Sequence, residues 1–157
     1  MAVKFKDLIY DILQNENFKS MKKYVHHGNV SAYTHSVSVA YLCYKYHIAK
    51  NPKYDIKEFV RGALLHDYYL YDWHNTGEGH RLHGFRHPFF AYKNAKRDFV
   101  VTPLMKDIIT HHMFPLTVIP PKSKAAWKVS YFDKVATIRD YKNKKKRKKA
   151  LKHRWLL

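Results

Sequence analysis

Apolar residues recur at three- and four-residue steps along most of this chain, which is the spacing of one face of an α-helix. The pattern predicts a helix over Lys4 to Gln14, whose inner face carries Phe5, Leu8, Ile9, Ile12 and Leu13. A second helix is predicted over Glu16 to Val25, and the Gly28-Asn29 pair that follows is typical of a turn. No stretch alternates apolar and polar residues for long enough to predict a strand.

Capping residues and prolines mark the starts of five further helices. Serine, threonine and aspartate side chains accept hydrogen bonds from first-turn amides, and proline lacks an amide that the first turn leaves unpaired. These signals predict helices that begin at Ser31, Asp55, His87-Pro88, Thr102-Pro103 and Ser123. With no strand pattern between them, we expect an all-α fold, a single-domain bundle of about six helices.

Length and composition favour one domain with its own core. The chain has 157 residues, with only 5 Gly and 6 Pro, which argues against long linkers. The single cysteine, Cys43, excludes an internal disulfide, and its apolar helical context predicts a core thiol. The sequence shows no long apolar span and no signal-peptide pattern, so we expect a soluble cytoplasmic protein without a membrane partner.

Basic residues strongly outnumber acidic ones. Thirty Lys and Arg against twelve Asp and Glu give a net charge of +18, which implies attraction to polyanions. Much of the excess lies between Lys142 and Lys149, so we divide the chain into a helical domain over residues 1–141 and a basic C-terminal helical extension over 142–157. The extension is interpreted either as a solubilising charged face or as a patch that binds nucleic acid.

Histidines and aspartates recur on the inner faces and at the ends of the predicted helices. His66-Asp67 ends an apolar run. Other residues of these types lie inside other predicted helices or at their ends: His35, His87, His111-His112 and Asp133. Side chains of these types that converge between helices can bind a metal ion. The pattern therefore predicts a metal site inside the bundle. His26-His27, beside the predicted turn, is interpreted as a surface pair outside that site.

The order of these residues resembles the HD-domain superfamily of metal-dependent phosphohydrolases. His35, His66-Asp67 and Asp133 match its signature of a histidine, a His-Asp doublet and a later aspartate. His87 and a histidine at the end of the following helix look like the additional ligands of two-metal members. The local sequence around these positions is most similar to that of small bacterial HD-domain hydrolases. The resemblance covers about residues 20 to 141 and implies an HD-domain-like bundle that hydrolyses phosphate esters or anhydrides.

The resemblance implies two neighbouring metal sites. One ion would take His35, His66, Asp67 and Asp133, and a second would share Asp67 with His87 and either His111 or His112. Adjacent helical residues point about 100° apart and seldom enter one site, and we favour His112 because the stretch that resembles the family begins with it. Nitrogen and oxygen ligands together suit Mn, Fe, Co, Ni or Zn better than Mg. Two such ions activate a water as hydroxide for attack on phosphorus.

Other residues are candidates for catalysis and substrate binding. Asp67 and Lys134 are the candidate catalytic residues, and the family pattern favours Lys134 for this role. The aromatic stretch from Tyr68 to Arg86 lacks a helical period and is expected to cover the site. Cations and imidazoles near the predicted ligands are candidates to bind substrate, with solvated surface charge as the alternative: Arg61, Arg81, His83 and Arg86.

Three functions agree with these patterns. The first is a phosphohydrolase that acts on a nucleotide or another small phosphorylated metabolite. The second is a helical protein that binds nucleic acid through its basic surface. The third is a di-iron HD-fold oxygenase, because the same ligand types bind iron. Either a monomer or a homodimer fits the sequence.

Overall fold

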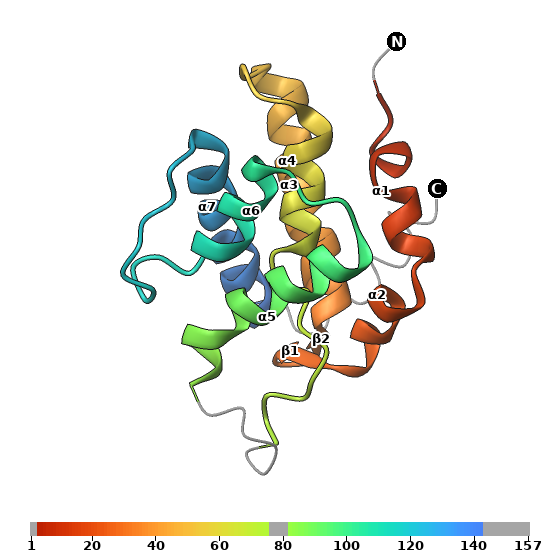
Figure 1. The fold of residues 1–157 in the computed structure, drawn as a ribbon, viewed down its shortest axis with the longest axis vertical. Coiled ribbons are helices and arrows are strands. Elements are labelled where there is room, and N and C mark those ends of the chain that lie inside the picture. The colour runs from red at the N-terminus through yellow and green to blue at the C-terminus, as the bar shows by residue number, and fades with distance from the viewer. Residues whose placement is uncertain (1–2, 76–81, 143–157) are drawn as a thin grey trace.

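The computed structural model describes residues 3–75 and 82–142, and within these ranges the chain folds into seven α-helices, one short 3-10 helix and one two-stranded hairpin. This arrangement confirms the all-α, single-domain prediction (Figure 1). The elements in chain order are α1 (Phe5–Gln14), α2 (Glu16–Ser20), η1 (Met21–Lys23), β1 (Val25–His27), β2 (Val30–Ser31), α3 (Ala32–Lys50), α4 (Ile56–Leu65), α5 (His83–Asp98), α6 (Pro103–His111) and α7 (Lys124–Lys142).

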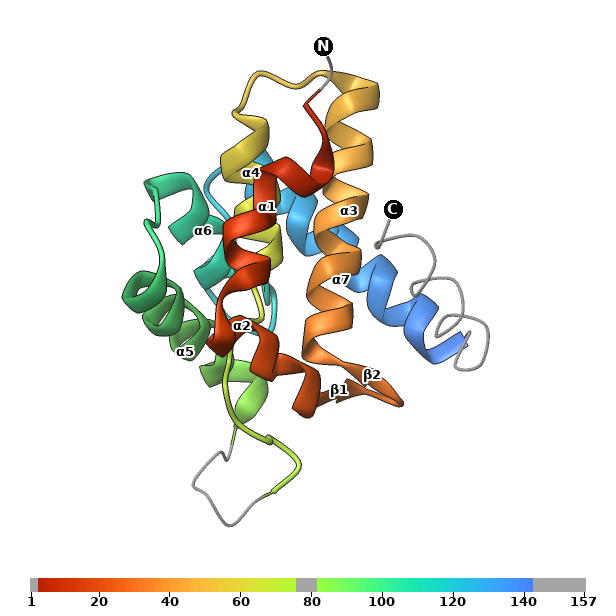
Figure 2. The ribbon, with the colours of Figure 1, turned by 90° about the vertical axis from the view of Figure 1, so that its right-hand side faces the viewer.

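Helices α3 and α4 form the centre of the bundle, and other helices cover them on both sides. Helix α1 packs on α4 on one side, while α6 and α7 pack on α4 and α3 on the other (Figures 1 and 2). Helix α5 lies against α6, and the β1–β2 hairpin lies at the N-terminal end of α3. The buried residues of α1 are Leu8, Ile9 and Ile12, as the apolar stripe predicted.

Side-chain caps fix the starts of four helices where the sequence predicted them. Each cap oxygen accepts a hydrogen bond from a backbone amide three residues later, which pairs one of the amides that a helix start leaves open. The four bonds measure 3.2 Å at Ser31, 2.8 Å at Asp55, 3.3 Å at Thr102 and 3.1 Å at Ser123.

The second predicted helix is shorter than expected. It ends at Ser20, a 3-10 turn follows, and Val25 then begins β1, which pairs antiparallel with β2. Gly28 makes the turn with a φ of 59°. The expectation that the chain has no strand is therefore wrong here, because strands of two and three residues are too short to show a period.

Helix α5 starts one turn earlier than predicted. It begins at His83, so Pro88 lies inside the helix and not in its first turn. The added turn is held from outside the helix, since the hydroxyl of Tyr71 lies 2.8 Å from Nδ1 of His83, and the Trp73 ring stacks on the His83 ring at 5.0 Å. Such contacts with a loop leave no periodic signal in the sequence.

Three further expectations concern single features of the chain. Cys43 is buried and free, as predicted, and burial raises the pKa of its thiol. None of the helices in the described ranges is long and apolar enough to cross a membrane. The basic C-terminal extension beyond residue 142 lies outside the described residues.

The end of α5 is tied to the segment after α4 through Asp98. Its carboxylate accepts hydrogen bonds from the adjacent Arg97 and from the hydroxyl of buried Tyr68, the latter at 2.6 Å. These bonds outweigh burial and lower the pKa of Asp98 to about 2. Because Tyr68 follows Asp67 directly, this contact also fixes the backbone next to the predicted metal site.

Asp98→Asn is expected to destabilise the fold in a pH-dependent way. The folded pKa lies below the unfolded value of about 3.9, so the carboxylate stabilises the fold above pH 4, and this stabilisation is lost as the pH falls towards 2. After allowance for solvent screening, we expect a difference of about 1 kcal/mol in unfolding free energy at pH 6. Urea titrations in chelator, with Asp72→Asn as control, measure it. A difference that stays constant down to pH 2.5 would contradict this assignment.

Candidate metal centre

Five helical segments bring the predicted ligands together in the middle of the bundle. His35 lies in the first turns of α3, His66 and Asp67 follow the end of α4, His87 lies in α5, His112 follows α6, and Asp133 lies in α7. All six side chains are buried. They form two groups that can hold metal ions, in which the ligand atoms lie within 4.8 Å of one another: His35, His66, Asp67 and Asp133, and Asp67, His87 and His112.

In the first group, two histidine nitrogens face two carboxylates. Nε2 of His35 lies 2.9 Å from Oδ1 of Asp133 and 3.7 Å from Oδ2 of Asp67. Nε2 of His66 lies 3.1 Å from the same Asp67 oxygen and 3.6 Å from Asp133. The four side chains thus direct two nitrogens and two oxygens at one small volume.

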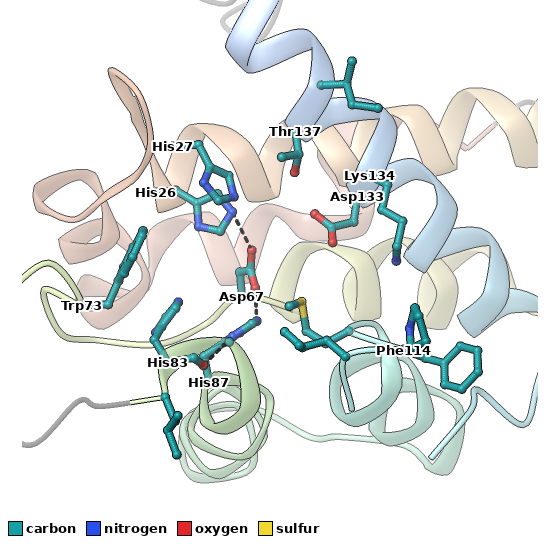
Figure 3. A pocket seen from close by; sticks show the side chains of 16 residues that line it. His26, His27, Asp67, Trp73, His83, His87, Phe114, Asp133, Lys134 and Thr137 are labelled. Carbon is teal, nitrogen blue, oxygen red and sulfur yellow. Dashed lines mark hydrogen bonds and ion pairs between the residues drawn. The ribbon is translucent and has the colours of Figure 1, made fainter. Parts of the chain in front are cut away.

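In the second group, the other oxygen of Asp67 is used. Nε2 of His87 lies 3.0 Å from Oδ1 of Asp67, and Nε2 of His112 lies 3.3 Å from it. The two Nε2 atoms lie only 2.9 Å apart. Asp67 therefore stands between the groups with one oxygen turned to each, which is the geometry of a bridging carboxylate (Figure 3).

When the rings of His66, His87 and His112 are neutral, hydrogen bonds on their far sides leave the inward nitrogens without protons. Nδ1 of His66 donates to the Ala63 carbonyl at 2.7 Å. Nδ1 of His87 donates to the His83 carbonyl at 3.0 Å, and Nδ1 of His112 donates to the Ile109 carbonyl at 2.8 Å. A neutral imidazole that donates through Nδ1 has a lone pair on Nε2. These three rings therefore present lone pairs to the carboxylates and to each other.

Such a cluster needs a cation. Nε2 of His66 and Oδ1 of Asp67 are buried and have no hydrogen-bond partner. Unpaired buried acceptors are costly, and lone pairs 2.9 Å apart repel each other. A divalent ion bound by these atoms satisfies all of them, so the residues fit a metal centre. Mixed nitrogen and oxygen ligands suit first-row transition metals.

The charges of the cluster agree with this interpretation. Burial opposes ionisation of Asp67 and Asp133, but contacts with histidines outweigh it and hold the pKa of both carboxyls well below the usual range. Burial of His66 lowers its pKa, yet the same two carboxylates raise it well above the usual value. Two ionised carboxylates thus attract a positive charge, which is a proton when no metal is bound.

His111 is turned away from the cluster. Its Nδ1 lies 2.7 Å from Oδ1 of Asp107, whose other oxygen accepts hydrogen bonds from the backbone and hydroxyl of Ser123. His111 therefore helps to join α6 to the start of α7. Its inclusion among the metal ligands is wrong for this geometry, and the preference for His112 agrees with the position of that ring in the second group.

His26 lies beside the cluster, although the sequence interpretation put it on the surface. Only 5% of His26 is exposed, because β1 holds its ring between α3 and the segment after α4. Its Nε2 lies 3.3 Å from Oδ2 of Asp67, its Nδ1 lies 2.8 Å from the hydroxyl of Tyr69, and its ring stacks on His35 at 4.2 Å. Burial lowers the pKa of His26 well below the usual value.

Asp140 is a second contributor that sequence reasoning missed. It is buried on α7, and its Oδ2 accepts a hydrogen bond from Nδ1 of His35 at 3.1 Å. Asp140 lies two helical turns after Asp133, so both carboxylates point from the same face of α7 to the same imidazole. That spacing was the available signal. A carboxylate behind a histidine fixes its tautomer and increases its basicity as a ligand.

Asp140→Asn is expected to weaken metal binding by about 10- to 100-fold without unfolding the protein. The amide keeps the size of the side chain but removes the charge that orients His35. Asp107→Asn is the matched control, because Asp107 makes the same kind of contact to His111 outside the cluster. Competition titrations with a coloured chelator measure the affinity. Equal affinities for the two variants would contradict the role of Asp140.

A cavity of about 1070 Å³ opens on the cluster. Asp67, His87 and Asp133 line it, together with the predicted catalytic Lys134 and the predicted substrate contact His83 (Figure 3). Nζ of Lys134 donates to Oγ of Ser130 at 2.7 Å, which holds the ammonium group close to the His112 carbonyl. Trp73 and His83 line the opposite side, so the described part of the aromatic stretch covers the site as expected.

The other predicted substrate contacts do not meet at this cavity. Arg61 points to α1, where its guanidinium donates to Asp11 at 2.8 Å and to the carbonyl of Leu8 at 3.2 Å. The structure therefore places Arg61 away from the cavity, on the side of α4 that packs against α1. Arg86 is exposed, and its guanidinium lies over the Phe90 ring. Arg81 lies outside the described residues.

Comparison of the chain with protein-family models, with curated proteins and with solved structures finds no match.

Proposed function

We propose that this protein is a divalent-metal-dependent phosphohydrolase of the HD-domain type that cleaves phosphate esters or anhydrides of small metabolites. The observation that carries the proposal is the pair of buried His/Asp groups that share Asp67 at the floor of an open cavity. A buried bridging carboxylate between two adjacent ligand groups is an arrangement suited to phosphoryl chemistry.

The first group would be held by His35, His66, Asp67 and Asp133, and the second by Asp67, His87 and His112. Metal ions bound there would supply Lewis acidity, which lowers the pKa of a water and stabilises charge on phosphoryl oxygens. The carbonyl bonds of His66, His87 and His112 fix their rings before any ligand arrives. This preorganisation avoids reorganisation during the reaction.

Lys134 supplies the cation that the protein itself contributes. Its Nζ is held by Ser130, whose hydroxyl in turn donates to the carbonyl of His112 at 2.7 Å. The ammonium group therefore lies at the cavity wall, beside the backbone that carries His112. A fixed cation at this position stabilises the negative charge that builds on the equatorial oxygens during phosphoryl transfer.

The test combines metal analysis with hydrolysis assays. The protein is purified without chelator, its metal content is measured, and hydrolysis of p-nitrophenyl phosphate and of a panel of nucleotides is followed in Mn, Co and Ni. The expected result is about two ions per chain and hydrolysis that chelator abolishes and metal restores. Bound metal without hydrolysis of any phosphate would overturn the proposal. Two irons together with oxygen consumption would favour the oxygenase alternative, which uses the same ligands.

A further inference from the structure

The walls of the cavity differ in chemistry from its floor. The floor carries the His/Asp groups, but the wall beyond them is built mainly from apolar side chains: Leu82, Met113, Phe114, Pro115, Leu116 and Ile138. These residues come from the start of α5, the connection after α6, and α7. A site for the polar remainder of a sugar phosphate or a polyphosphate would need hydrogen-bonding groups in this wall.

Cations are scarce in the same wall. Among the described residues that line the cavity, Lys134 is the single lysine or arginine, although the chain has thirty of them. One ammonium group next to the floor can contact one phosphoryl group. Nucleoside triphosphates and similar anhydrides carry further phosphates, and protein sites bind these with additional Lys, Arg or backbone donors.

One side of the cavity is flat and aromatic. The Trp73 and His83 rings stack at 5.0 Å with an interplanar angle of 12°, and His83 stacks in turn on His87 at 4.6 Å (Figure 3). His83 is held in this position by the Tyr71 hydroxyl. Phe114 faces this side from across the cavity. The stacked rings form a rigid aromatic column that lines this side of the cavity, and an apolar group of similar size can pack against it.

Large apolar side chains also remain exposed at the edge of the cavity. The exposed fractions are 69% for Leu82, 43% for Leu116 and 54% for Ile138. A cavity mouth surrounded by exposed aliphatic residues is typical of a surface that is covered when a ligand binds. Leu116 packs closely on α5, since a Cβ on Gly84 would lie 2.9 Å from its Cδ2.

We propose that the substrate is a phosphomonoester with a large apolar organic group, which packs between the aromatic side and the aliphatic edge while its single phosphoryl group lies over the His/Asp floor. This inference rests on the proposed phosphohydrolase function and narrows it. In the reaction, an oxygen from water bonds to phosphorus and the phosphorus–oxygen bond to the alcohol breaks. The alcohol oxygen takes a proton from the water, so the products are inorganic phosphate and an apolar alcohol.

Kinetics with esters of matched reactivity test the proposal. The compounds 2-(1-naphthyl)ethyl phosphate, glucose 6-phosphate and AMP are all monoesters of primary alcohols, so their leaving groups are similar and their organic parts differ. We expect kcat/KM for the naphthylethyl ester to exceed that for the other two by at least about tenfold, because burial of the ring system adds binding energy. ATP is expected to be a poorer substrate than AMP.

Variants at the cavity edge distinguish the loss of a contact with the substrate from a general loss of activity. Leu116→Ser and Ile138→Ser are expected to reduce the ratio of naphthylethyl to glucose ester kcat/KM by about three- to tenfold each. Both side chains are partly exposed, so the fold should tolerate the change. Val118→Ser is the matched control, since Val118 is 86% exposed on the same connection and does not line the cavity.

Binding without turnover distinguishes the failure of this proposal from the failure of the hydrolase function. Calorimetry compares 2-(1-naphthyl)ethyl phosphonate with methyl phosphonate, neither of which can be hydrolysed to a phosphate. Hydrolysis of all esters at similar rates, or a preference for ATP, would overturn the apolar substrate and leave the hydrolase intact. Absence of hydrolysis would overturn the proposed hydrolase function. The affinities of the two phosphonates would then show whether the cavity selects apolar groups. Equal affinities would overturn the present inference as well.

Discussion

Asp67→Asn is expected to remove both metal ions and to reduce phosphate hydrolysis by at least about 1000-fold. One oxygen of Asp67 faces each ligand group, at 3.1 Å from His66 and 3.0 Å from His87. Asparagine keeps the shape but replaces one oxygen by an amide nitrogen, which cannot bind a metal. Whichever way the amide turns, one group loses its shared ligand, and both lose the negative charge.

The control for this variant is Asp72→Asn. Asp72 lies five residues later in the same chain segment, with a 54% exposed side chain that accepts a hydrogen bond from the His74 amide. This change should leave metal content and hydrolysis as they are. Metal analysis by mass spectrometry and thermal unfolding are measured for both variants. A folded Asp67→Asn protein that retains two ions per chain, or one tenth of the activity, would refute the bridging role.

His112→Asn is expected to reduce the metal content from two ions to one and the activity by at least about 100-fold. The asparagine amide can still donate to the Ile109 carbonyl, as Nδ1 of His112 does, but it lacks the Nε2 atom that faces Asp67. The second group would then retain only two of its three ligands.

His111→Asn is the matched variant for this experiment. The two histidines are adjacent at the end of α6. His111 pairs with Asp107, whereas His112 faces the cluster. We expect His111→Asn to keep both ions and to lose stability by about 1 kcal/mol, through a weaker contact to Asp107. Loss of one ion in His111→Asn and not in His112→Asn would reverse the assignment of the two residues.

Some of the predicted ligands have positions that follow from helix boundaries. Asp55 caps α4, and the apolar run after it determines where the helix ends, so His66 and Asp67 must follow there. In the same way Thr102 and Pro103 define α6 and the histidine at its end. The residues that start a helix lie next to one another in the sequence, so the amino-acid sequence alone predicts where these helices begin.

His26 was misassigned because its burial depends on contacts that are distant in sequence. The residues near it, Gly28 and Asn29, indicate a surface turn, and the turn is present. The hairpin nevertheless lies against Tyr69 and His35, which bury one face of β1. A strand of three residues has two side chains on one face and a single one, here His26, on the other, so no repeated pattern distinguishes the buried face from the exposed one.

Arg61 shows the opposite error. Its proximity in sequence to His66 suggested a role at the site, but Arg61 precedes His66 by five residues, so the two side chains point about 140° apart around the helix. The acidic partner that determines its position, Asp11, lies in α1. Only the packing of α1 on α4 brings the two together, and this is not encoded in the spacing around Arg61.

The distribution of ligands over five helical segments has a consequence during protein synthesis. A nascent chain that has emerged as far as His112 carries every residue of the second group, but the first group still lacks Asp133, and His35 lacks its partner Asp140. The first group becomes complete only when the ribosome has released α7 and that helix has docked on α3. Metal uptake by the proposed centre is therefore expected to report that α7 has docked, and chains cut before α7 would remain metal-poor and open to cellular proteases.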